Sequence, residues 1–215
     1  MGSRNTSGFS LVELMVVLVV AAIVLGIGVP AFADFIATNR MAATVNDLVS
    51  GLHLARSEAV KRRTNSSICA SDDWNTPNPT CNAAGRLADG WIVFVDCSVP
   101  PPAQGGICGP PNLIVDAFDT VYSTHGPMPD TIADNTTVWP VGTEYVSFGA
   151  NGFPRTIAGQ GQPKTDFQLC DHRGNHDTGG GRAAGRWIQI TTTGRPQMYH
   201  DQNYIQGARN PLNGC

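Results

Sequence analysis

The sequence predicts an α+β protein in which a long N-terminal helix, half transmembrane and half amphipathic, packs on a C-terminal antiparallel β-sheet domain. Three observations predict this fold. The first is an apolar run over residues 9–33 whose single charge is Glu13. The second is an apolar stripe at helical spacing over residues 41–59, and the third is a series of short β-type runs after Thr64.

The composition fits one globular domain with an additional segment. The chain has 215 residues, a net charge of −3 and 14% charged residues, whereas typical soluble domains have about 25%. Residues 64–139 carry one basic and eight acidic side chains, while half of the basic side chains lie in residues 140–215. This balance excludes a protein that coats polyanions over its whole surface. So few charges suit a chain that lies in a membrane or among copies of itself.

Residues 9–33 are long enough to cross a membrane. As a helix, the first part of the run, 9–29, would span about 30 Å, the thickness of the hydrocarbon core of a bilayer. A cleaved secretory signal is the alternative, but its apolar region has only about 7–15 residues. Because this run is longer and continues directly into a helical pattern, it is interpreted as a retained membrane anchor.

Glu13 interrupts this apolar run. A carboxylate inside a membrane helix costs about 2.5–3.5 kcal/mol on insertion scales, so such residues are functional by default. The alternative is a glutamate at the membrane interface near the helix start, where the helix dipole favours negative charge.

Residues 34–63 continue the helix with an amphipathic pattern. Its apolar positions follow a spacing of four and three, which places them on one helix face. They are Met41, Val45, Leu48, Leu52, Ala55 and Ala59. The basic residues 61–63 suit the negative end of the helix dipole and close the helix. A coiled-coil seam is the alternative, but the two small alanines favour packing on a sheet.

Residues 64–215 are expected to form a β-rich globular domain, because short apolar runs alternate there with turn residues. The expected strands are 68–70, 91–95, 113–118, 144–148, 167–170 and 187–192. The sequence Gly-Ala-Asn-Gly at 149–152 predicts a hairpin turn. Two long loops, at about 97–112 and 171–186, show no pattern that predicts an element.

The six cysteines all follow the membrane segment: Cys69, Cys81, Cys97, Cys108, Cys170 and Cys215. An even number without a Cys-x-x-Cys pair, in an exported domain, predicts disulfides and not zinc. Proximity in the chain selects Cys69–Cys81, Cys97–Cys108 and Cys170–Cys215 among the fifteen connectivities that six cysteines allow. The first two bonds would close short loops, each worth about 3 kcal/mol in the chain-entropy account.

The N-terminus resembles the class III signal of type IV pilins and type II secretion pseudopilins. The resemblance rests on the leader MGSRNTS and the sequence GFSLVE at 8–13. It implies that a prepilin peptidase cuts between Gly8 and Phe9, so that residues 1–8 are a leader, and that Phe9 is then N-methylated. It also makes Glu13 the assembly glutamate, and it places Pro30 where members of the family often carry a helix-kinking proline.

A finer resemblance to the GspH/FimT branch of minor pilins and pseudopilins comes from LHLARSEAVKRR, GWIVFVD and ITTTGRP. It implies a type IV pilin-like fold and a structural subunit that primes assembly or lies near the filament tip. The expected partners are other pilin or pseudopilin subunits, the prepilin peptidase and the inner membrane. We expect a single-pass inner-membrane protein with a periplasmic C-terminal domain, which then enters a pilus or pseudopilus in the periplasm or at the cell surface.

Two alternatives stay within this family. One is a type II secretion pseudopilin that contacts exported protein, and the other is a FimT-like minor pilin that binds DNA in natural transformation. The second is suggested by the basic C-terminal third, where aromatic residues are close in sequence to arginines. Those residues are Arg173, Arg182, Arg186, Arg195, Arg209, Trp187 and Tyr199.

The candidate DNA contacts are Arg182, Arg186 and Arg195. The GRxR-like motif of the DNA-binding members is incomplete here, because the sequence at 194–197 is Gly-Arg-Pro-Gln and lacks the second arginine. The alternative is that these arginines pair with nearby aspartates or are solvated.

The sequence contains no catalytic constellation. His172 and His176 would share one face of a helix and could bind a metal, but Gly174 and the glycines at 179–181 disfavour a helix there. The sequence GGGRAAGR lacks the Lys-Ser/Thr of a P-loop, and there is no G-x-S-x-G. We therefore expect no enzyme, no cofactor and no metal.

Overall fold

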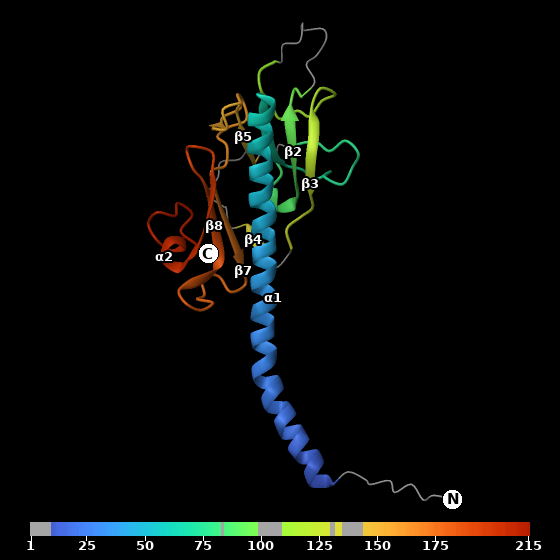
Figure 1. Cartoon of the computed structure of the whole chain (residues 1–215), viewed down its shortest axis with the longest axis vertical. Helices are drawn as coiled ribbons and strands as arrows, with labels where there is room; N and C mark the ends of the chain where they lie inside the picture. The colour runs from blue at the N-terminus through green and yellow to red at the C-terminus, as the bar shows by residue number, and fades with distance from the viewer. Residues whose placement is uncertain (1–9, 83, 99–108, 130–131, 135–143) are drawn as a thin grey trace, which may run out of the picture. The chain divides into compact units, whose positions relative to one another are not determined.

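The computed structural model describes residues 10–82, 84–98, 109–129, 132–134 and 144–215. The chain divides into two compact units, Met1–Asn39 and Arg40–Cys215. Helix α1 (Leu11–Arg62) begins in the first unit and ends in the second (Figure 1). The single long helix expected from the sequence is therefore confirmed, and it ends one residue earlier than expected.

The described residues of the first unit form an apolar helix with exposed side chains. Its large apolar residues are exposed to a high degree, for example 74% at Leu11 and 64% at Phe32. The most apolar stretch of α1 has a mean hydropathy of 2.8 and none of it is buried. In the described part of the chain, α1 is the one helix long and apolar enough to cross a membrane.

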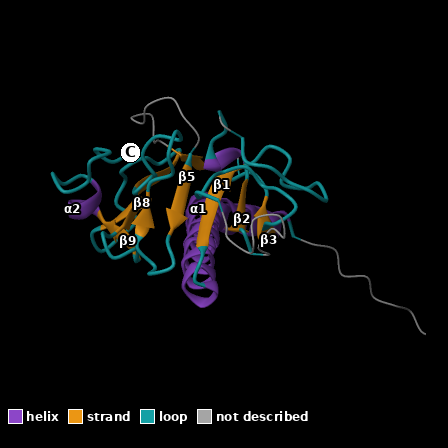
Figure 2. Cartoon of the chain, turned by 90° about the horizontal axis from the view of Figure 1, so that it is seen from above, coloured by secondary structure: helices purple, strands orange, loops and turns teal. Residues whose placement is uncertain are grey.

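The second unit contains two antiparallel sheets. The five-stranded sheet has the order β3-β2-β1-β5-β6, with β1 (Asn65–Ala70), β2 (Trp91–Asp96), β3 (Thr120–His125), β5 (Tyr145–Phe148) and β6 (Pro154–Arg155). The four-stranded sheet has the order β4-β7-β8-β9, with β4 (Ile132–Asp134), β7 (Asp166–Asp171), β8 (Arg182–Ile190) and β9 (Pro196–Asp201). Two short helices complete it, η1 (Leu87–Asp89) and α2 (Gln202–Ile205). Seen from above, β8 and β9 lie to the left of α1, and β2 and β3 lie to its right (Figure 2).

One core joins the helix to both sheets. The six apolar positions predicted to form the inner face of the helix are all 0–1% exposed: Met41, Val45, Leu48, Leu52, Ala55 and Ala59. They cluster with Ile68 and Val93 of the first sheet and with Phe167 and Ile188 of the second. Packing of the helix on a sheet, and not a coiled-coil seam, is therefore what the structure shows.

Gly51 lies on the same helix face, at a position where the neighbouring strand leaves no room for a side chain. A Cβ atom there would be 2.6 Å from the ring of Trp91 on β2. The indole can therefore pack directly against the helix backbone, which brings the first sheet close to α1.

The expected strand at 113–118 is wrong. This segment is a loop, in which the Asp116 carboxylate accepts the Phe118 backbone N–H and the Asp119 carboxylate accepts the Asp116 N–H. Such side-chain bonds compete with a strand ladder. Leu113 is nevertheless buried, because the loop packs against the second apolar cluster.

Four strands were missed: β3, β4, β6 and β9. The sequences of β3 (TVYSTH) and β9 (PQMYHD) are largely polar, and both strands lie at sheet edges and are partly exposed. β4 and β6 have only three and two residues. In addition, β8 begins at Arg182, inside the region expected to be a loop.

Candidate functional site

Glu13 lies in the first turn of α1, on an exposed apolar helix. The Leu14 backbone N–H donates to the Ser10 carbonyl at 3.1 Å, so helical hydrogen bonding begins at Ser10. Gly8 and Phe9, the predicted cleavage and methylation residues, lie outside the described residues. Among those described, no side chain pairs with the Glu13 carboxylate. A partner for this charge in apolar surroundings would have to come from residues beyond the described ones or from another molecule.

Pro30 lies inside α1, which continues on both sides of it. Its ring removes one backbone donor from the helix. Gly26 and Gly28 lie four and two residues before Pro30 and have no atoms within 4 Å of the position of a side chain. The kink expected at Pro30 stays a prediction.

Two disulfides are present among the described residues: Cys69–Cys81 and Cys170–Cys215. Both are pairs that proximity in the chain had selected. Cys97 is also disulfide-bonded, and Cys108, its expected partner, lies outside the described residues. The first bond ties the end of β1 to the following loop, and the second ties β7 to the C-terminal segment.

The three candidate DNA-contacting arginines do not form one patch. Arg182 and Arg195 are at opposite ends of the β8–β9 hairpin, because Arg182 pairs in register with Asp201 whereas Arg195 precedes the Pro196–Ile190 pair. β8 is irregular between Arg182 and Trp187, so the separation of these ends follows the six residues of the regular partner strand β9 and is about 17 Å.

Arg186 is occupied by the protein itself. Its Nη1 atom donates to the carbonyl oxygens of Ala183, Ala184 and Gly185, at 2.5, 3.0 and 2.8 Å. Burial, reinforced by the nearby charge of Arg173, lowers the pKa of Arg186. These bonds satisfy carbonyls at the irregular part of β8, so this guanidinium has a structural role.

A different arginine, Arg56 on α1, holds together two turns from the two sheets. Its Nε donates to the Gly152 carbonyl at 3.0 Å, and its Nη2 donates to the Thr193 carbonyl at 3.3 Å. The turn after β5 is the hairpin turn expected at 149–152, closed by Gly149 N–H to Phe153 carbonyl at 3.0 Å. The sequence LHLARSEAVKRR contains Arg56, but no local pattern shows that its partners lie about a hundred residues away. This contact was missed.

His172 and His176 lie in the turn between β7 and β8 and not on a helix, and Gly174 between them has a φ of 59°. Within the described ranges, no group of three or more His, Cys, Asp or Glu side chains is placed to hold a metal ion.

An apolar N-terminal helix that continues into the core of a disulfide-bonded, antiparallel β unit defines a pilin-like subunit. Two family models match the chain. The model described as "Type II transport protein GspH" matches residues 44–194, which is more than half of the chain. The model described as "Prokaryotic N-terminal methylation motif" matches residues 3–29. The chain belongs to the GspH family of minor pilins and pseudopilins.

The chain is also similar to two crystal structures of the type IV minor pilin FimU from Pseudomonas aeruginosa. For the crystal form in space group P21 the identity is 22%, with 75% of this chain and 89% of that chain covered and a TM-score of 0.40. For the form in P65 the identity is 21%, the coverage 74% and 91%, and the TM-score 0.36. No curated protein matches the chain.

Proposed function

We propose that this chain is a minor pilin or pseudopilin, a structural subunit that enters a type IV pilus or pseudopilus through its N-terminal helix. The observation that carries this proposal is the exposed apolar helix with Glu13 in its first turn. The match of residues 3–29 to the methylation motif supports it. In this role the chain is a building block and not an enzyme, and it needs no cofactor.

The proposed route to the filament begins in the inner membrane, where α1 is the anchor and the β-rich domain lies in the periplasm. A prepilin peptidase removes residues 1–8 and methylates Phe9. The new amino terminus is a cation next to a membrane helix. When subunits dock, Glu13 of one subunit pairs with the amino terminus of its neighbour, so two charges that are costly in apolar surroundings neutralise each other.

The place of the subunit within the filament is proposed at the initiating end, where it primes assembly or lies near the tip. Membership of the GspH family is compatible with a pilus and with a secretion pseudopilus, and in either the docking chemistry of Glu13 is the same. Binding of DNA, and contact with exported protein, stay predictions from the sequence. The positions of Arg182, Arg186 and Arg195 in the fold do not favour DNA binding.

The proposal is tested by replacing Glu13 with alanine in cells that make the filament. Glu13→Ala should stay in the membrane, because it removes a charge from the membrane helix. It should also be cleaved normally, because the proposed cut lies between Gly8 and Phe9. Its amount in sheared filaments should fall at least about tenfold, since 1.4 kcal/mol of docking energy already changes an equilibrium tenfold. The measurement is an immunoblot of filament and membrane fractions, with cleavage followed by electrophoretic mobility.

Glu13→Asp is the matched control, because it keeps the carboxylate and should restore part of the incorporation. Wild-type incorporation of Glu13→Ala would overturn the assembly role. Equal loss in both variants would show that a carboxylate at this position does not restore docking when its side chain is one methylene shorter.

A further inference from the structure

The four-stranded sheet has a second, smaller layer on the face away from α1. Residues alternate between the two faces of a strand, and Ile188 and Ile190 of β8 face the main core. Trp187 therefore faces the opposite side, where it forms a separate cluster with Ala183 and Ile205, against which Tyr199 packs.

Three aromatic rings follow one another in this outer layer and are called the aromatic stack below. The rings of Trp187 and Tyr199 are stacked with their centroids 4.5 Å apart, and the ring of Tyr204 lies 5.3 Å from that of Tyr199 and is tilted by 31° to it. Trp187 is 2% exposed, whereas Tyr204, at the other end, is 41% exposed. The indole N–H of Trp187 donates to the buried carboxylate of Asp166 at 3.0 Å, which fixes the inner end of the stack. The stack thus presents a supported aromatic ring to solvent.

Arg209 lies beside this stack and is held in place by the residue that follows it. The Asn210 side chain is 1% exposed and donates to the Gln168 side-chain oxygen at 2.7 Å and to the Ile205 carbonyl at 2.8 Å. The Cys170–Cys215 disulfide anchors the same segment to β7. Within the described part of the chain, the Arg209 guanidinium itself has no hydrogen-bond or ion-pair partner.

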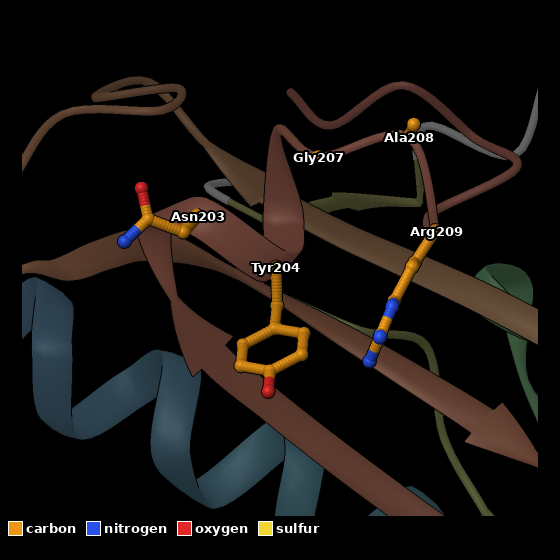
Figure 3. Close-up of a pocket in the computed structure, with 5 residues that line it drawn as sticks. All are labelled: Asn203, Tyr204, Gly207, Ala208 and Arg209. Atoms are coloured by element: carbon orange, nitrogen blue, oxygen red, sulfur yellow. The ribbon is translucent and has the colours of Figure 1, made fainter.

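Two neighbouring hollows share Tyr204 and Arg209. One has a volume of about 300 Å³ and is lined by Trp187, Gln189, Tyr199, Tyr204 and Arg209. The other, of about 260 Å³, is lined by Asn203, Tyr204, Gly207, Ala208 and Arg209. Figure 3 shows the Tyr204 and Arg209 side chains extending to the same side of the chain, with the Asn203 side chain directed away from them. Sites for drug-sized ligands have volumes of about 300–1,000 Å³, so each hollow fits a single ring.

We propose that this surface, the Tyr204–Arg209 platform, binds two consecutive rings of a glycan in which every second sugar carries a carboxylate. The C–H face of a sugar is apolar and packs on an aromatic face, while its hydroxyl groups need polar partners at the rim. In one hollow, half-buried Gln189 can supply such a partner through its side-chain oxygen, while its Nε2 donates to Asp166 Oδ1 at 3.3 Å. The guanidinium of Arg209 can bind a carboxylate with two parallel hydrogen bonds. One cation shared by two ring-sized hollows matches one charge for every two sugars.

The charge around the platform favours a glycan over a single-stranded nucleic acid. A nucleic-acid strand carries one phosphate for each base and is bound by grooves that are basic along their length. Arg182, at the start of β8, pairs in register with Asp201 just before α2, and it lines neither of the two hollows. The guanidinium of Arg186 is bonded to backbone carbonyls. Arg209 is thus the cation available on the platform among the described residues that line it.

The test measures binding of two matched hexasaccharides to the full chain in detergent micelles by isothermal titration calorimetry. One is chitohexaose, which is neutral. The other is a peptide-free hexasaccharide of alternating N-acetylglucosamine and N-acetylmuramic acid, which adds a carboxylate to every second sugar of the same backbone. The wild-type chain should bind the acidic probe about tenfold more tightly, as expected for one charge-assisted pair.

Three variants locate the binding on the platform. Tyr204→Ala should weaken the binding of both probes at least about tenfold. Tyr204→Phe, which keeps the ring, should bind both probes within about threefold of the wild-type affinity. Arg209→Gln should lower the affinity for the acidic probe to that for the neutral probe, and it should leave the affinity for the neutral probe unchanged. Arg182→Gln, at an exposed arginine outside the platform, should change neither.

Three results would overturn the proposal. The first is no heat of binding for either sugar up to about 1 mM, which corresponds to a binding energy below about 4 kcal/mol. The second is binding that survives Tyr204→Ala. The third is tight binding of a twelve-residue oligothymidine that Tyr204→Ala and Arg209→Gln abolish, which would identify a nucleic-acid surface instead.

Discussion

Gly194 offers a sharp test of how the two sheets are joined to α1. Gly194 and Gly161 have the same φ, 78°, which L-residues with a side chain rarely adopt. At Gly161, however, no atom lies within 4 Å of where a Cβ would be, whereas at Gly194 the Cβ would be 2.1 Å from the Gly152 carbonyl oxygen and 3.2 Å from Arg56 Nε. The two alanine variants therefore share the backbone strain and differ in the contact.

The expected losses of stability follow from these distances. Left-handed strain costs about 1–2 kcal/mol in either variant, and restriction of the unfolded chain offsets about 0.4–1 kcal/mol of it. Gly161→Ala should therefore lower the free energy of unfolding by about 1 kcal/mol. In Gly194→Ala the two turns must also separate, which disrupts the Arg56 bonds to Gly152 and Thr193. A hydrogen bond from a charged donor contributes about 1.5–3 kcal/mol. The bond to Thr193 is exposed and long and adds little, so the part-buried bond to Gly152 and the backbone strain together give a total loss of about 3 kcal/mol.

The assay is urea unfolding of the full chain in detergent micelles, followed by tryptophan fluorescence. All four tryptophans lie after residue 40, so the signal reports on the β-rich unit. Arg56→Met keeps the alkyl chain but removes the donors, and the loss in the double variant with Gly194→Ala should be smaller than the sum of the two single losses. Equal losses for Gly161→Ala and Gly194→Ala, or strict additivity with Arg56→Met, would refute this account of the junction.

Two further outcomes are expected. Replacing both cysteines of Cys170–Cys215, which are 45 residues apart, should lower the free energy of unfolding by about 4 kcal/mol. Replacing those of Cys69–Cys81, which are 12 residues apart, should lower it by only about 3 kcal/mol, because closing a longer loop restricts the unfolded chain more. Urea titration measures both losses, and a larger loss for the shorter loop would contradict this entropic explanation. Burial raises the pKa of Asp96 to about 6, whereas in the unfolded chain it is about 3.9. Between these two pH values the folded state still holds a proton that the unfolded state has released. The free energy of unfolding should therefore fall as the pH rises from about 4 to about 6. Asp96→Asn should weaken this decrease and raise stability at pH 7; an unchanged pH profile would show that Asp96 is ionised in the fold.

The helix could be predicted in detail from the sequence, and the β domain only in outline. The apolar face at 41–59 is set by helical periodicity, which is a local property, and all six of its residues are buried in the core. Strands β1, β2, β5 and β7 are rich in apolar residues and lie inside their sheets, so their sequences carry the signal. The edge strands β3 and β9 depend on neighbours supplied by the fold, and their polar sequences give little indication of them.

The functional residues also fall into two groups, those that a local motif predicts and those that only the fold brings together. The sequence around Glu13 forms a contiguous motif, and its reading needs no tertiary structure. The contacts of Arg56, and the approach of Tyr204 to Tyr199 and Arg209, arise only when distant segments meet. Tyr199 and Arg209 stood out in the sequence as members of a basic and aromatic C-terminal third, but Tyr204, which completes the platform, did not.

The contacts of Arg56 also set an order of events during synthesis. Arg56 and Thr193 are 137 residues apart in the chain, and at about 5–20 residues per second the ribosome needs on the order of ten seconds to make the intervening segment. The first sheet can cover part of the inner helix face once β5 has been made, but Phe167 and Ile188 of the same core follow later. Contacts between residues so distant in sequence form slowly. For that interval α1 carries an uncovered apolar stripe, and a chaperone that binds nascent chains would find its binding surface there.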